Sequence, residues 1–256
     1  MRAAAILALV LALAPSLAAP RDGRAVMDEA DRNRRTKSEY SEGLITVEEK
    51  GRTKVKAWRS WRLGWGPSAR GLIQFTEPAE VKGVGLLTLS VPHGPAEQWF
   101  YAPAIDRDRR VARQEKSTRF IGTHFTYEDM EERDIDGYTY ELEGEEAIGG
   151  TPCFRVVATP AASEESQYSK LVFWVRKERA VTLRVEGWVD GARRRVFEGS
   201  DVREISGVPV VQTWVVTDAK REGTTRLVVS NVKIDPPVDP AFFTVSSMRT
   251  IHEPAK

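Results

Sequence analysis

Short stretches in which apolar and polar residues alternate follow one another along most of the chain. Each is rich in Val, Thr, Trp, Tyr and Phe and is closed by Gly, Pro, Asp or Asn, which is the composition of strands and of the turns between them. Brief connections such as Asp190-Gly191 and Glu222-Gly223 are typical of tight hairpins. The predicted strands cover residues 42–50, 53–65, 69–78, 83–91, 97–104, 137–148, 151–160, 168–178, 180–190, 193–205, 208–218 and 224–234.

One segment ahead of these strands has helical periodicity. Within residues 23–35, Ala25, Val26, Met27 and Ala30 lie toward one side, and charged residues occupy the rest. A single helix followed by roughly a dozen strands excludes both a doubly wound α/β fold and a helical bundle. The pattern predicts a mainly β protein, built on one large, strongly curved antiparallel sheet that is closed or partly closed as a barrel.

Two of the predicted strands are apolar on both faces. In residues 168–178, Phe173 alternates with Trp174, and in residues 208–218 Val211 alternates with Trp214. A sheet that met water on one side would carry polar residues there. The second face of this sheet must therefore be covered by the helix, by loops or by a ligand.

Aromatic residues supply the candidates for an apolar binding site. The seven tryptophans have large surfaces that suit either a core or a lipid-binding cavity. Alternation along one strand sends Trp58 to the face opposite Trp61 and Trp65, so both faces carry indole rings. The candidates for a cavity that holds acyl chains are Trp58, Trp61, Trp65, Trp99, Phe100, Tyr101, Phe173 and Trp174.

The N-terminal residues have the pattern of a secretory signal peptide. Arg2 precedes an uncharged apolar run, which Pro15 ends, and small residues follow up to Ala18. An apolar run of about 12 residues is too short to cross a bilayer as a finished helix. We therefore expect residues 1–18 to be a cleaved signal peptide and residues 19–256 to form one exported domain, with a retained N-terminal anchor as the alternative.

The charge balance and the single cysteine exclude several classes of function. Without residues 1–18 the chain has 37 basic and 37 acidic side chains, which argues against nucleic-acid binding. Cys153 is the only cysteine, so it forms neither an intramolecular disulfide nor a zinc site, and we interpret it as a small core residue. The basic run 107–119 predicts a charged outer surface, with an anionic headgroup or partner site as the sharper alternative.

The chain lacks the motifs of common catalytic and metal sites. His93, His124 and His252 do not have the spacing of metal ligands, and no phosphate-binding loop or nucleophile elbow is present. We therefore expect no enzymatic activity, no cofactor and no metal. An enzyme that acts on an apolar substrate remains a third hypothesis, for which His124 and Glu128 are the first ionisable groups to test.

Residues 121–132, "IGTHFTYEDMEE", concentrate acids around a histidine. Thr126 followed by acidic residues resembles a helix start, because carboxylates stabilise the positive end of the helix dipole. We expect a short helix that runs to about Arg133 and is held on the sheet by apolar neighbours. A metal site built from its acids is disfavoured, because consecutive acids do not converge on one face of a helix. The motif itself comprises Phe125, Thr126, Tyr127, Glu128 and Asp129.

Three blocks of sequence occur in a fixed order, at residues 73–87 ("IQFTEPAEVKGVGLL"), 97–112 ("EQWFYAPAIDRDRRVA") and 120–130 ("FIGTHFTYEDM"). The series resembles the outer-membrane lipoprotein-sorting protein family of the LolA-like superfamily. In that family the pattern reads approximately F-x-x-P-A-x-x-K-G, then W-x-Y-x-P, an Arg-rich stretch, and F-x-G-S-D-F-T-Y-E-D. This chain has Thr123-His124 where the family has Ser-Asp, so no role of that Asp is carried over.

The resemblance implies a half-open, incomplete antiparallel β-barrel with an N-terminal helix and short helices that plug its concave mouth. It also implies a periplasmic carrier whose apolar cavity takes acyl chains of a lipid or lipoprotein toward the outer membrane, with transient contact to membrane surfaces. An inner-membrane transporter of the RND/MMPL type is the partner that the resemblance implies. The alternative is an accessory or assembly protein that docks an envelope transporter complex and whose interior is only a core.

Overall fold

The computed structural model describes residues 22–92 and 94–253. The predicted signal peptide and His93 therefore lie outside the described residues. One helix, α1 (Gly23–Arg34), precedes the sheet, and the Asp22 side chain caps it by accepting a hydrogen bond from the Ala25 amide at 2.7 Å. The strands are β1 (Ser38–Glu49), β2 (Arg52–Leu63), β3 (Arg70–Glu77), β4 (Gly85–Val91), β5 (Gly94–Ala102), β6 (Arg107–Arg110), β7 (Tyr138–Ile148), β8 (Thr151–Pro160), β9 (Lys170–Arg176), β10 (Val181–Val189), β11 (Ala192–Ile205), β12 (Val208–Asp218) and β13 (Thr224–Ile234).

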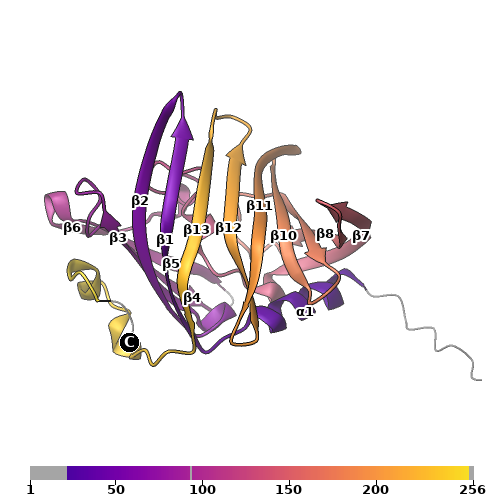
Figure 1. Ribbon diagram of the computed structural model, residues 1–256, viewed down its shortest axis with the longest axis horizontal. Helices are drawn as coiled ribbons and strands as arrows, with labels where there is room; N and C mark the ends of the chain where they lie inside the picture. The colour runs from indigo at the N-terminus through magenta and orange to yellow at the C-terminus, as the bar shows by residue number, and fades with distance from the viewer. Residues whose placement is uncertain (1–21, 93, 254–256) are drawn as a thin grey trace, which may run out of the picture.

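These 13 strands form one antiparallel sheet with the order β6-β5-β4-β3-β2-β1-β13-β12-β11-β10-β9-β8-β7 (Figure 1). The sheet is two meanders joined at the centre, where β1 pairs with β13. We call β1–β6 the first arm and β7–β13 the second arm. The edge strands β6 and β7 do not pair, so the sheet stays open, and the predicted mainly β fold with a single curved, incompletely closed antiparallel sheet is confirmed.

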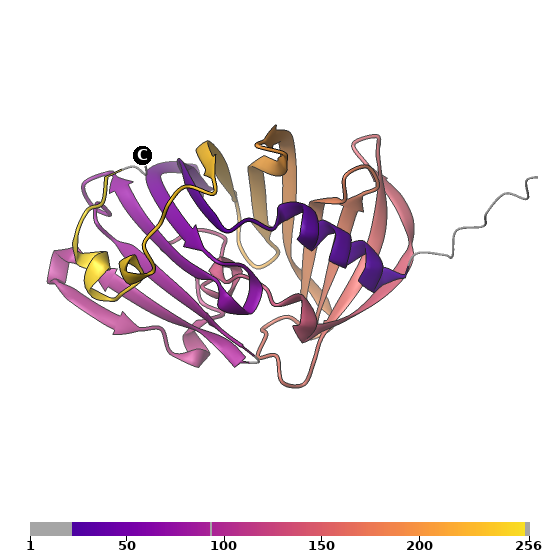
Figure 2. The same cartoon turned by 90° about the horizontal axis from the view of Figure 1, so that it is seen from below.

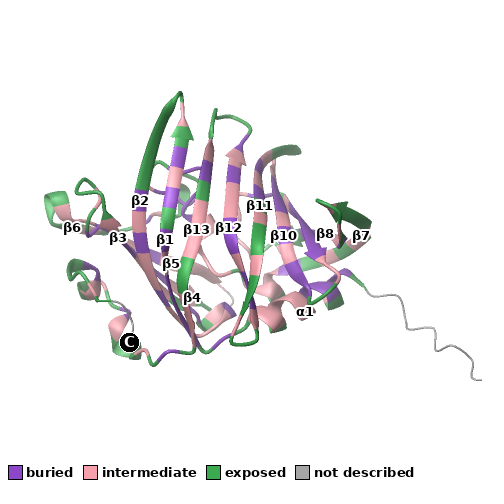
Figure 3. Ribbon diagram, in the orientation of Figure 1, coloured by how far each residue is buried: buried purple, intermediate pink, exposed green. Residues whose placement is uncertain are grey.

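The local pattern located the strands closely. All twelve predicted strands have a counterpart, and the extra strand β6 lies in the basic run. Asp190 and Gly191 both have positive φ, of 50° and 76°, as the two central residues of a tight hairpin turn require. Figure 3 shows buried positions on β1, β2 and β12, whereas the end of the β1–β2 hairpin is exposed.

Two elements cover the concave face of the sheet. Figure 2 shows α1 lying across the strands of the second arm, and the helix contacts β7, β8, β9, β10 and β12. Residues 111–137, which we call the crossing segment, connect the edge strands and contain the short helices η3 (Arg113–Glu115), η4 (Glu128–Met130) and η5 (Ile135–Gly137). The crossing segment is tied to both arms, because Lys56 donates to the Ile121 carbonyl at 3.2 Å and the His124 amide donates to Thr225 at 2.9 Å.

The opposite, convex face is covered in a different way on each arm. On the first arm, the C-terminal segment 235–253 packs its Phe243 into a cluster with Tyr40 and Trp61. On the second arm, Trp174 is buried between the guanidinium groups of Arg155 and Arg184, whose centres lie 5.4 and 5.2 Å from its ring. The second apolar face of β9 noted in the sequence is thus covered by arginine side chains, whereas the C-terminal segment covers Trp61 on the outer face of β2.

Candidate functional site

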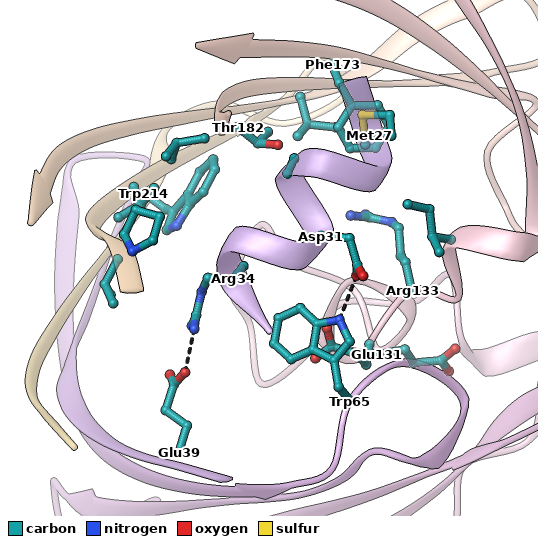
Figure 4. Close-up of a pocket in the computed structure, with 18 of the residues that line it drawn as sticks. Met27, Asp31, Arg34, Glu39, Trp65, Glu131, Arg133, Phe173, Thr182 and Trp214 are labelled. Atoms are coloured by element: carbon teal, nitrogen blue, oxygen red, sulfur yellow. Dashed lines mark hydrogen bonds and ion pairs between the residues drawn. The ribbon is translucent and has the colours of Figure 1, made fainter. Parts of the chain in front are cut away.

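A cavity of about 560 Å³ lies between the concave face, α1 and the crossing segment (Figure 4). Its volume falls within the range of roughly 300–1,000 Å³ that is usual for small-molecule sites. On one side it is closed by Met27 and Ala30 of α1. The sheet supplies most of the apolar wall, which comprises Trp58, Phe173, Val181, Val185, Val210, Val211, Trp214, Leu227 and Val229.

Part of this apolar wall is in contact with solvent. Trp214, Leu227 and Val229 are only half-buried, although they line the cavity on the inner face of the sheet. Leaving apolar surface wet costs about 25 cal/mol for each Å². An apolar ligand that covered these side chains would recover that free energy, so the cavity favours an apolar guest.

Charged side chains form the rim of the cavity between α1 and the start of the first arm. Glu39 accepts from Arg34 and lies near Arg62, with N–O distances of 2.7 and 3.3 Å. Burial acts to raise the pKa of Glu39, but the charges of the two arginines outweigh it and hold that pKa below its ordinary value. Trp65 donates its indole N–H to Asp31 at 2.6 Å, and Arg62 lies over the Trp65 ring at 4.5 Å. This rim is therefore a fixed, largely self-paired network.

The structure brings three of the eight aromatic candidates to the cavity, namely Trp58, Trp65 and Phe173. Trp61, Tyr101 and Trp99 belong to the cluster beneath the C-terminal segment, and Phe100 packs against Tyr127. Trp174 lies on the opposite face of β9 from Phe173. Contact between any of these rings and a ligand stays a prediction.

The alternation of side chains along β2 correctly predicted that Trp58 and Trp61 lie on opposite faces, but the same prediction for Trp58 and Trp65 is wrong. Trp58 and Trp61 do lie on opposite faces of β2, in different clusters. Trp65, however, lines the same cavity as Trp58. The strand ends at Leu63, and Gly64 adopts a φ of 78°, so the chain turns before Trp65 and the alternation no longer applies.

Several cavity residues were missing from the candidates derived from the sequence. Trp214 and Leu227 form much of the wall, and Ala30 closes it from α1. The signal for Trp214 was present, because its strand is apolar on both faces. Which face of β12 points into the cavity depends on its pairing with β13, in which Trp214 lies opposite Leu227. That pairing is not a local property of the sequence.

The acidic motif forms one tight turn and not the predicted helix to Arg133. The helix η4 covers only Glu128–Met130. The Asp129 carboxylate reaches back to accept from both the amide and the hydroxyl of Thr126, at 2.8 Å each, and from the Tyr168 hydroxyl at 2.7 Å. Glu128 accepts from the Gln167 amide at 2.9 Å. The acids of the motif thus accept hydrogen bonds from the loop before β9. These bonds hold Glu128 and Asp129 in a single turn, and the helix ends at Met130.

His124 serves as an anchor of the crossing segment. Its ring is 1% exposed, with Nδ1 2.8 Å from the Thr225 hydroxyl and Nε2 3.3 Å from the Glu222 carbonyl. Burial lowers the pKa of His124, which favours the neutral imidazole. Neither His124 nor Glu128 lines the cavity. Over the described ranges, no group of three His, Cys, Asp or Glu side chains is placed to hold a metal ion.

The basic run is paired with acids of the same chain. Arg109 lies 2.7 Å from Glu115, and Arg110 lies 2.6 Å from Glu97. Only Arg119 reaches a second hollow of about 750 Å³, between the β1–β2 hairpin, the β3–β4 loop and residues 119–122. Charged side chains make up about half of the lining of that hollow, including Lys50, Arg52, Lys54 and Lys56.

Glu131 is a cavity residue with an altered protonation equilibrium. Its side chain is 15% exposed, and one carboxylate oxygen lies 2.7 Å from Lys116 Nζ. Burial raises the pKa of Glu131 to about 7, because the loss of hydration outweighs the attraction of Lys116. The folded protein therefore holds a proton on Glu131 at pH values where the unfolded chain, with a pKa of 4.5, has lost it.

We expect Glu131 to make the stability of the protein fall as the pH rises. Its contribution is fully present below pH 4.5 and is lost through about pH 7, because the folded state binds the extra proton in that window. Relative to Glu131→Gln, the free energy of unfolding of the native sequence should drop by about 2–3 kcal/mol between pH 5 and pH 8. Urea denaturation of both proteins at each pH measures this difference, and equal pH dependence in the two would contradict the assignment.

A family model whose description reads "-like: Uncharacterized protein" matches residues 68–250. No curated protein matches the sequence. No helix among residues 22–92 and 94–253 combines the length and the apolar character needed to cross a membrane.

Solved structures from three bacteria share the fold. A domain described as an outer membrane lipoprotein-sorting protein, from Vibrio parahaemolyticus, has a TM-score of 0.84 and 22% identity, covering 89% of this chain and 98% of its own. A DUF1329 family protein from Desulfovibrio piger has a TM-score of 0.84 and 26% identity, covering 88% of this chain and 97% of its own. A LolA superfamily protein from Nitrosomonas europaea has a TM-score of 0.72 and 17% identity, covering 89% of this chain and 100% of its own. The fold of this chain is therefore LolA-like.

Proposed function

Because the chain belongs to the family of uncharacterized proteins whose model matches residues 68–250, and because its fold is LolA-like, we propose that it is a carrier of lipid or lipoprotein acyl chains. The carrier binds without catalysing a reaction and works in the periplasm, where it moves its cargo toward the outer membrane. The similarity to a domain described as an outer membrane lipoprotein-sorting protein supports transport of the cargo toward the outer membrane.

The observation that carries the proposal is the half-wet apolar wall inside the cavity. Trp214, Leu227 and Val229 face a space of about 560 Å³ that α1 closes from the other side. Each methylene that moves from water into such a space contributes roughly 0.8 kcal/mol, so an acyl chain gains affinity without any directional contact.

A transporter of the RND/MMPL type is the proposed partner in the inner membrane, and phospholipid surfaces are proposed as transient contacts. Both proposals rest on the resemblance of the motifs in residues 73–130 to lipoprotein-sorting proteins. Cross-linking in intact cells, followed by purification of the carrier, should recover such a transporter. Recovery of the carrier alone would remove this part of the proposal and leave the acyl-chain site in place.

The carrier proposal predicts that the protein holds lipid. Native protein extracted with organic solvent should release acyl-containing compounds that mass spectrometry identifies, and the emptied protein should take up a fluorescent fatty acid. Unfolded protein carried through the same extraction is the control for adventitious lipid. A clean extract together with no uptake of the fluorescent fatty acid would overturn the proposal.

A further inference from the structure

The crossing segment leaves an arginine without a partner inside the cavity. Arg133 lines the cavity, is exposed to solvent there, and has no hydrogen bond or ion pair with any residue that the structure describes. Figure 4 shows its guanidinium pointing from the crossing segment toward α1, with no dashed line at it, whereas Arg34 is paired with Glu39.

Two acids that precede Arg133 in the crossing segment, Asp129 and Glu131, are already engaged. Asp129 accepts from Thr126 and Tyr168, and Glu131 pairs with Lys116. Partial loss of hydration inside the cavity acts to lower the pKa of Arg133, but nearby Tyr138 and Asp129 outweigh it and keep that pKa above its ordinary value. The guanidinium is therefore charged, with its donors directed into the cavity and free to bind a guest.

The other charged residues of the cavity do not replace Arg133 as the free group. Asp31 is occupied by Arg35 and by the indole N–H of Trp65, and Glu39 is paired with Arg34. Glu132 is the remaining acid. Burial raises the pKa of Glu132, which favours its neutral form, although the charges of Arg62 and Arg34 oppose this.

We infer that Arg133 is the anchor for an anionic group, a carboxylate or a phosphate, at the head of an apolar chain held in this cavity. The inference rests on the proposed carrier function and narrows its cargo from any acyl chain to an anionic amphiphile. A guanidinium suits such a group, because it offers paired N–H donors that match the oxygens of a carboxylate or phosphate. The apolar wall around Trp214 and Leu227 then takes the chain.

The test compares ligands that differ only in the head group. Emptied protein is titrated with oleate, with its neutral methyl ester and with the cationic oleylamine. The native sequence should bind oleate at least about 10-fold more tightly than methyl oleate, and oleylamine no better than the ester, because a charged hydrogen bond in a sheltered site is strong. Arg133→Gln should bind oleate as weakly as methyl oleate, and Arg133→Lys should keep part of the preference.

A matched variant separates this role from a general loss of positive charge. Arg226→Gln removes an exposed arginine of β13, next to the cavity residue Leu227 but pointing to the other face of the sheet. It should retain the full preference for oleate. Equal binding of oleate and methyl oleate by the native sequence, or a preference that survives in Arg133→Gln, would overturn the anchor and leave the carrier proposal standing. Failure to bind any of the three compounds would overturn both.

Discussion

Replacement of Gly43 by alanine is expected to destabilise the protein by about 2–4 kcal/mol. A Cβ atom at this position would lie 2.0 Å from the Val228 carbonyl oxygen and 2.7 Å from the Trp58 ring. The first contact is with the backbone of β13, which cannot move without breaking the pairing that joins the two arms. The second is with a buried indole that forms part of the cavity wall. The absent side chain of Gly43 thus lets this indole lie over β1.

Urea denaturation measures this effect through the midpoint of unfolding, and the slope of the transition should change little. Gly71→Ala on β3 is the control, because a Cβ there has no neighbour nearer than 4.0 Å. That variant should stay within about 0.5 kcal/mol of the native sequence or gain slightly, since alanine restricts the unfolded chain. Equal stability of the two variants would show that the centre of the sheet adapts to a side chain at Gly43.

The strands and the helix of this fold could be read from local patterns. Alternation and turn residues mark strands wherever they pair, so Asp190-Gly191 predicted a hairpin without knowledge of its partners. The same holds for α1, where Asp22 caps a run of good helix formers. The local pattern of the acidic motif wrongly predicted a helix to about Arg133. Its carboxylates are instead bound by Tyr168 and Gln167, which lie almost 40 residues away in the sequence.

The composition of the cavity could not be read in this way. Alternation separates Phe173 from Trp174, but only the curvature of the sheet and the position of α1 decide that Phe173 faces the cavity. The lack of a partner for Arg133 likewise depends on the tertiary structure and not on the local sequence. The residues 128–133 are almost all charged, and Ser166, Tyr168 and Lys116 determine which charges are neutralised. Sequence reasoning therefore predicted the presence of an apolar concave face better than the residues that build it.

Replacement of Ala30 by tryptophan is expected to weaken the binding of fluorescent fatty acid by at least 10-fold while leaving the fold intact. Ala30 is a half-buried residue of α1 that lines the cavity, so an indole there occupies the space that the guest needs. The cost in helix propensity is small, about 0.5 kcal/mol, and new contacts with the apolar wall offset it. Titration gives the affinity, and urea denaturation should show a stability within about 1 kcal/mol of the native sequence.

The same variant separates a carrier from an assembly protein. Ala192→Trp is the control, because it adds an identical ring at the exposed start of β11, away from the cavity. A carrier that cannot load loses its function in cells even when it still meets its partner. An accessory protein that docks a transporter complex through its surface would work normally with a filled interior, because the outer face of α1 and the sheet are unchanged. Loss of transport in Ala30→Trp with partner cross-links retained therefore supports the carrier, and full function of a folded variant that no longer binds lipid would assign the protein to assembly.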